Sequence, residues 1–104
     1  MPTLVLKSLI CSQQQESPGN DEPYIVVNGQ TVWETSAMKS KQRKDIDVSV
    51  PFETQAEIKL FEKDGVDPDD LFGVQVVSDS PLGERNLSFM DGREGYTLWV
   101  DVQA

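Results

Sequence analysis

Apolar and polar residues alternate along most of the chain. In one segment, apolar Ile46, Val48, Val50 and Phe52 are separated by single aspartate, serine or proline residues. A period of two places successive side chains on opposite faces of an extended chain, so this segment predicts a strand with one buried face. The same period predicts further strands at Ile58 and Leu60, at Phe72, Val74 and Val76, at Leu87 and Phe89, and at Tyr96, Leu98, Val100 and Val102.

The first third of the chain carries three more strand signals. Residues Thr3 to Cys11 are largely apolar, which predicts a strand buried on both faces. Residues Tyr24 to Trp33 contain two β-prone runs separated by Asn28-Gly29. Asparagine followed by glycine readily adopts the positive φ angles of a type I′ turn, so these runs predict a β-hairpin.

These segments together predict about eight strands and no helix. Clusters rich in proline, glycine, aspartate and serine separate them, as expected for turns. Such a series of short strands is typical of an antiparallel β-sandwich, so the fold class is all-β. A chain of 104 residues has room for one core, and we expect a single domain over residues 1–104.

The net charge limits the classes of partner. Nine basic residues stand against eighteen acidic ones, a formal net charge of −9, so phosphate backbones and anionic lipids would be repelled on average. Nucleic-acid binding is therefore not expected. Lys39, Lys41, Arg43 and Lys44 nevertheless form a basic cluster. Two interpretations stay open for this cluster: a solvated strand edge, or a patch for anionic lipid or an acidic partner.

The supply of reactive side chains argues against an enzyme. The sequence has no histidine, which excludes Ser–His and Cys–His nucleophile pairs and the commonest metal ligand. A glycosidase built from carboxylates alone would need a deep cleft, which a sandwich of this size rarely provides. The single cysteine, Cys11, permits no internal disulfide, and we expect it in the core of a cytoplasmic protein.

Two acidic segments are the strongest candidates for a binding site. The first contains Glu16 and, six residues later, Glu22 followed by Pro-Tyr-Ile. The second contains Glu62, Asp64 and, six residues after Asp64, Asp70 followed by Leu-Phe-Gly. An EF-hand does not explain the second segment, because its acidic spacing fails and strands flank it.

This arrangement resembles the C2 (C-two) domain family, the calcium- and phospholipid-binding β-sandwich of synaptotagmins and protein kinase C. The resemblance covers most of the chain and implies an eight-stranded sandwich in which two loops at one end bind calcium. It also implies five ligands, at Glu16, Glu22, Glu62, Asp64 and Asp70. Three of these positions hold glutamate where the family pattern has aspartate.

The expected function is that of a small, soluble, non-enzymatic binding module with calcium as its ligand. The alternative is a calcium-independent protein-interaction or structural module with the same fold. A protein partner is expected rather than a membrane, because four clustered positive charges face an otherwise acidic chain. Membrane binding is expected to be limited to weak, calcium-dependent association with anionic lipid.

Overall fold

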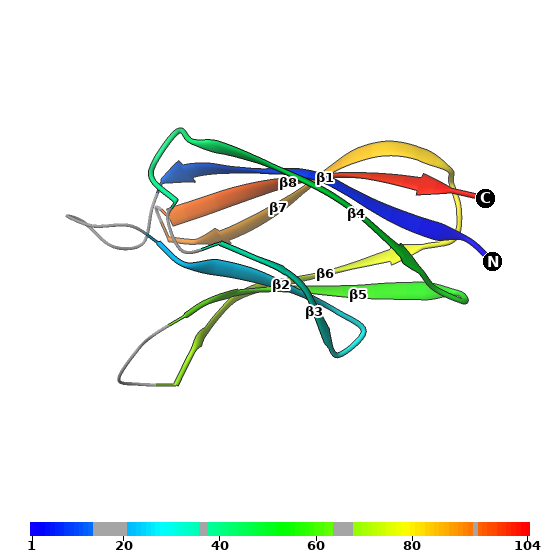
Figure 1. Cartoon of the computed structure of the whole chain (residues 1–104), viewed down its shortest axis with the longest axis horizontal. Helices are drawn as coiled ribbons and strands as arrows, with labels where there is room; N and C mark the ends of the chain where they lie inside the picture. Colours follow the sequence, from blue (N-terminus) through cyan, green and yellow to red (C-terminus); the bar gives the residue numbers. More distant parts are fainter. Residues whose placement is uncertain (14–20, 36–37, 64–67, 93) are drawn as a thin grey trace.

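Eight antiparallel strands form two facing four-stranded sheets in a computed structural model that describes residues 1–13, 21–35, 38–63, 68–92 and 94–104. One sheet has the order β4-β1-β8-β7 and the other β3-β2-β5-β6 (Figure 1). The predicted all-β sandwich is confirmed. The strands are β1 (Thr3–Gln13), β2 (Pro23–Val27), β3 (Gln30–Glu34), β4 (Arg43–Pro51), β5 (Gln55–Glu62), β6 (Asp70–Ser78), β7 (Gly83–Asp91) and β8 (Glu94–Gln103).

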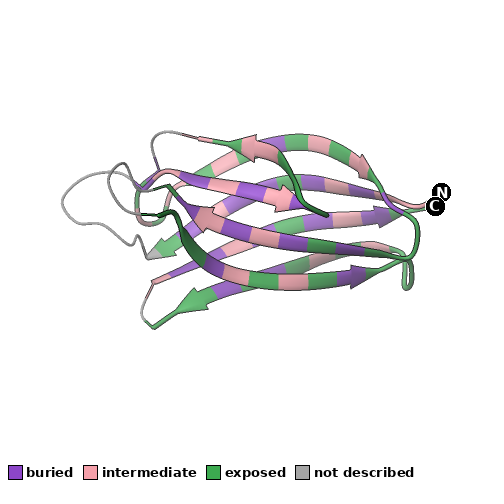
Figure 2. Ribbon diagram, turned by 90° about the horizontal axis from the view of Figure 1, so that it is seen from below, coloured by how far each residue is buried: buried purple, intermediate pink, exposed green. Residues whose placement is uncertain are grey.

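The inward faces of the two sheets form one core, and burial alternates along the strands (Figure 2). β8 follows the predicted period most closely, because its alternate apolar residues are all buried: Tyr96, Leu98, Val100 and Val102. Cys11 is also fully buried in this core, as expected. Among the described residues there is no helix long and apolar enough to cross a membrane.

Two of the irregularities in strand pairing, one in β1 and one in β6, shift the predicted alternation. In β1 the pairing shifts between Leu6 and Ser8, and Lys7 is exposed there. The outer face of β1 is therefore only partly covered, and the prediction that this strand is buried on both faces is wrong. In β6, Leu71 pairs with Phe61 but Gly73 pairs with Leu60, so Phe72 is an extra residue.

The bulge in β6 reverses the face on which the later residues lie. Phe72 and Val77 are buried at 5% and 1% exposure, whereas Val74 and Val76 are 44% and 53% exposed. The alternation of Phe72, Val74 and Val76 therefore marks a strand, but only Phe72 lies on the buried face. A bulge inserts one residue into one strand of a pair, and the sequence pattern alone does not reveal it.

The predicted hairpin joins β2 to β3. Asn28 and Gly29 both have positive φ, at 49° and 86°, as a type I′ turn requires. Asn28 also fixes the hairpin to β5, since its backbone N–H donates to the Glu57 carbonyl and its side-chain oxygen accepts the Glu57 N–H. The hairpin is therefore held by local geometry and by a contact with its neighbouring strand.

Both termini lie at one end of the sandwich, and the start of β2, the end of β5 and the start of β6 lie at the other end (Figure 1). The connection between β3 and β4 is also at this second end. Of the basic cluster, Arg43 and Lys44 begin the edge strand β4, as the edge interpretation predicts. Lys39 and Lys41 instead lie in the connection before it, with Lys41 at a φ of 67°.

Candidate functional site

Three of the five predicted ligands lie at the ends of neighbouring strands. Glu22 directly precedes β2, Glu62 ends β5 and Asp70 begins β6. In the sheet, Glu62 is opposite Pro23 on one side and Asp70 on the other. The other two ligands, Glu16 and Asp64, lie outside the described residues. The fold thus places the three described positions at the same end of one sheet.

Glu62 has a structural contact that the sequence did not reveal. Its side chain is 4% exposed and its Oε2 accepts the backbone N–H of Glu22 at 2.7 Å. The backbone N–H of Lys63 in turn donates to the Glu22 carbonyl at 3.1 Å. One carboxylate oxygen of Glu62 is therefore already used to join the start of β2 to the end of β5.

The described carboxylates alone do not fit a calcium ion. In the described part of the chain, no three or more acidic, histidine or cysteine side chains are grouped so that they could hold a metal. Calcium takes six to eight oxygen ligands, so Glu22, Glu62 and Asp70 would have to be joined by further ligands. Glu16 and Asp64 are the candidates that the sequence supplies.

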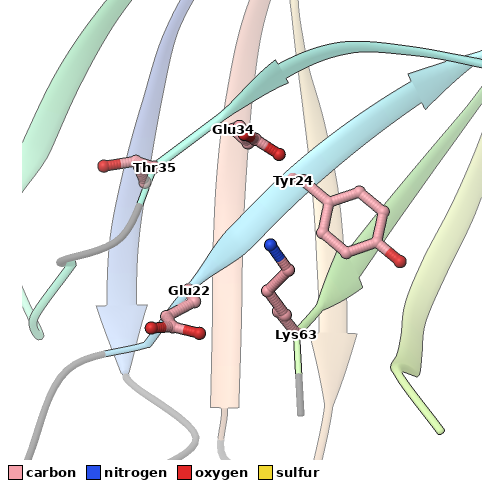
Figure 3. Close-up of a pocket in the computed structure, with 5 residues that line it drawn as sticks. All are labelled: Glu22, Tyr24, Glu34, Thr35 and Lys63. Atoms are coloured by element: carbon pink, nitrogen blue, oxygen red, sulfur yellow. The ribbon is translucent and has the colours of Figure 1, made fainter. Parts of the chain in front are cut away.

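Beside these residues is an open pocket of about 400 Å³. It is lined by Glu22, Tyr24, Glu34, Thr35 and Lys63, which come from β2, β3 and the residues that adjoin β2, β3 and β5. Figure 3 shows the Lys63 ammonium pointing into the space between Glu22, Glu34 and Tyr24. The pocket presents charges of both signs beside an aromatic ring, which suits a polar group of a partner molecule.

Tyr24 connects this pocket to the second acidic segment. Its ring stacks on Phe61, with centroids 5.2 Å apart and planes 9° from parallel. Its hydroxyl donates to Asp69 Oδ2 at 2.6 Å. Desolvation, together with this hydrogen bond to Asp69, raises the pKa of Tyr24 to about 12. The residues before β6 are thereby tied to β2 through a side chain.

Asp21 is a buried carboxyl group that the sequence analysis missed. It is fully buried and accepts a hydrogen bond from the hydroxyl of the buried Tyr96. Its backbone exchanges two hydrogen bonds with Met38, at 2.8 and 3.0 Å. Burial, followed by the bond to Asp21, raises the pKa of Tyr96. Asp21 therefore fixes the chain before β2 to the core and to the connection between β3 and β4.

Comparison with known proteins identifies the fold through structure and not through sequence. No protein-family model and no curated protein sequence matches the chain. A solved C2 domain, however, superimposes with a TM-score of 0.65 over 100% of both chains at 13% identity. A C2 domain of plant extended synaptotagmin 1 gives a TM-score of 0.63 over 97% of this chain and 90% of that one, at 9% identity.

A longer protein shows the same similarity. Human GIVD cytosolic phospholipase A2 matches 98% of this chain with a TM-score of 0.66 at 13% identity, but only 16% of the enzyme's chain takes part. The chain is therefore a divergent C2-like domain by fold, and the resemblance read from the acidic segments is confirmed. At these identities the similarity establishes the fold alone.

Proposed function

We propose that this chain is a non-enzymatic binding module whose acidic loop end binds calcium and, through it, a partner. The observation that carries the proposal is the position of Glu22, Glu62 and Asp70 at the same end of three adjacent strands of a C2-like sandwich. Glu16 and Asp64 follow the spacing of the family pattern and would complete the ligand set. Bound calcium would supply positive charge at an end of the molecule that is rich in carboxylates.

A second candidate function is a calcium-independent interaction module. The Glu62 carboxylate, buried and bonded to the Glu22 amide, favours it, because this bond occupies an oxygen that a calcium ion would need. The adjoining pocket, with Lys63 between Glu22 and Glu34, offers a partner both a cation and two carboxylates without any metal. In this candidate the same end of the sandwich binds a protein directly.

Calorimetric titration with calcium tests the first candidate against the second. If calcium binds only the folded chain, calcium at about 100 times its dissociation constant should stabilise it by roughly 2.7 kcal/mol against chelated protein. Magnesium should do much less, because it requires a tighter octahedral shell of oxygens. Asp70→Asn and Asp64→Asn should each abolish the heat and the shift in melting temperature.

Asp79→Asn is the matched control, because Asp79 follows β6 at the opposite end of the same strand and carries the same charge. It should bind calcium as the unaltered chain does. Absence of both heat and stabilisation at millimolar calcium would reject calcium binding and leave the calcium-independent module.

A further inference from the structure

The edge strand β6 differs in composition from the other edges of the two sheets. β3, β4, β6 and β7 are the edge strands. β4 carries Arg43, Lys44, Asp45 and Asp47 and ends in a proline, β7 carries charges at both ends, and β3 is five residues long. Charges, prolines and shortness are the usual means by which an edge is kept from pairing with another chain. β6 also has charges at its two ends, Asp70 and the following Asp79, and a bulge at Phe72, but its eight residues from Leu71 to Ser78 include neither a charge nor a proline.

The outer face of β6 is also apolar and exposed. Leu71, Val74 and Val76 are 50%, 44% and 53% exposed, and they account for three of the seven large hydrophobic side chains exposed in the described residues. In the sheet, Leu71 lies opposite Phe61 and Val74 opposite Lys59. An added strand would therefore find apolar side chains to pack against on this face.

The backbone of β6 is paired on one side only. β5 forms the ladder on that side, and β6 is the last strand of its sheet. Toward the other sheet, the Gln75 side chain donates to the Ser88 carbonyl of β7 at 2.7 Å, which is a side-chain contact and not a ladder. The second edge of β6 is therefore open to main-chain pairing within the part of the chain that the structure describes.

The charges at the two ends of β6 indicate which kind of strand could pair with its open side. Asp69 and Asp70 stand at its start and Asp79 follows its end. Two copies of β6 paired antiparallel about the midpoint between Val74 and Gln75 would place Asp70 of each copy opposite Asp79 of the other. Like charges in opposed positions destabilise a strand pair, and each chain also has a net charge of −9. A second copy is therefore disfavoured, and a segment with basic ends is favoured.

We propose that β6 is a docking edge for an extended segment of a partner protein, which adds to the sheet as a fifth strand. The segment has an uncharged, β-branched centre of about six residues, which fits within the eight uncharged residues of β6, with lysine or arginine at both ends. Main-chain hydrogen bonds would provide affinity, and the flanking aspartates would provide specificity. This docking edge requires no calcium, although Asp70 at its start is also one of the predicted calcium ligands.

Fluorescence anisotropy with a labelled synthetic peptide, KRTVTVTVKR, tests the proposal in the presence of chelator. We expect saturable binding, at least about tenfold weaker for the acidic counterpart EDTVTVTVDE, as opposed like charges would cause. Hydrogen exchange should slow on binding in residues 71–78 and not at the start of β2 or the end of β5. Because chelator is present throughout, failure of calcium binding would leave this result unaffected.

Val76→Lys should weaken binding of the basic peptide about tenfold, because it places a like charge on the docking edge. Leu82→Lys is the matched control: Leu82 is similarly exposed, at 56%, and lies outside β6. Equal binding of both peptides, equal loss in both variants, or no binding at millimolar peptide would overturn the proposal. A concentration-dependent dimer in sedimentation equilibrium that Val76→Lys disrupts would also overturn it and identify a second copy as the occupant.

Discussion

Tyr24 and Tyr96, the two tyrosines of the chain, each donate a hydrogen bond to an aspartate that adjoins an acidic segment. Tyr24 reaches Asp69 across the surface, and Tyr96 reaches Asp21 in the interior. Both hydroxyls are held in their protonated form, since burial and the carboxyl partner disfavour the phenolate. These two side chains therefore connect the core to the candidate binding end.

Tyrosine ionisation should report this arrangement. Folded Tyr24 keeps its proton until about pH 12, whereas an unfolded tyrosine loses it near pH 10. Between pH 10 and 12 the folded chain therefore binds more protons than the unfolded chain. The contribution of Tyr24 to the free energy of unfolding is complete below pH 10 and is lost as the pH rises toward 12. Tyrosinate absorbance should stay near zero through pH 10 while the protein is folded. A normal titration of either tyrosine near pH 10, in protein shown to be folded by circular dichroism, would contradict these contacts.

Removal of the Tyr96 hydroxyl should destabilise the fold. Tyr96→Phe leaves the buried Asp21 carboxyl without this donor, and we expect a loss of about 1–3 kcal/mol in the free energy of unfolding. Urea denaturation measures the change. Tyr24→Phe is the control, because it removes a hydrogen bond near the surface and should cost less than about 1 kcal/mol. Equal losses in the two variants would show that burial of Asp21 does not increase the cost.

At the same scale, the sequence identified some site residues and missed others for a physical reason. The resemblance to the C2 family implied that Glu22, Glu62 and Asp70 would lie at one end of the sandwich, and the strand ends place them at the same end of one sheet. The sequence analysis did not predict that Glu62 is buried against the Glu22 amide. It also did not predict that Asp21, which precedes Glu22, is buried. Burial of one acidic residue in a row depends on contacts with distant residues, and spacing contains no information about them.

At the scale of elements, local signals in the sequence located all eight strands. The alternation of apolar residues located five, an apolar run located β1, and the runs on either side of Asn28-Gly29 located β2 and β3. The order of the strands and the bulges at Lys7 and Phe72 depend on pairing between distant segments. For this reason the strand β6 was predicted from its apolar residues, but the exposure of Val74 and Val76 on its outer face was not. The hairpin turn was predicted, because Asn28-Gly29 determines its own geometry, but the shift in pairing between Ile25 and Val26 was not.

The contact between Asn28 and β5 gives a prediction at this scale. Asn28→Gly keeps the positive φ of the turn but removes the acceptor of the Glu57 N–H, which lies at 2.8 Å. We expect a loss of about 1 kcal/mol in the free energy of unfolding by urea. Asn28→Asp retains an oxygen acceptor and should lose less. If the aspartate variant were the less stable of the two, the hydrogen bond to Glu57 would not be the stabilising contact.

For the whole molecule, charge should limit association with lipid. Anionic lipid attracts basic residues at about 1 kcal/mol each, so Lys39, Lys41, Arg43 and Lys44 offer at most about 4 kcal/mol. The rest of the chain opposes them, with five basic against eighteen acidic residues, a net charge of −13. The structure reduces the attraction further, because Arg43 pairs with Asp45 at 3.3 Å. Vesicle sedimentation should show no binding to neutral lipid and weak, salt-sensitive, calcium-dependent binding to anionic lipid. Tight binding to phosphatidylserine vesicles in chelator would refute this, and replacing the four basic residues by alanine would then test the cluster.

The position of the two termini at the end opposite the start of β2 and the end of β5 also determines how the domain responds to mechanical force. Thr3 of β1 is paired with Gln103 of β8, and the two strands are central in their sheet. Tension applied through the termini would load this ladder at its first pair, so that hydrogen bonds break one after another as in a zipper. Tension between the N-terminus and Asp91, near the opposite end, would instead shear several strands at once. The same fold should therefore be mechanically weak when pulled by its termini and more resistant when force enters through its loop end.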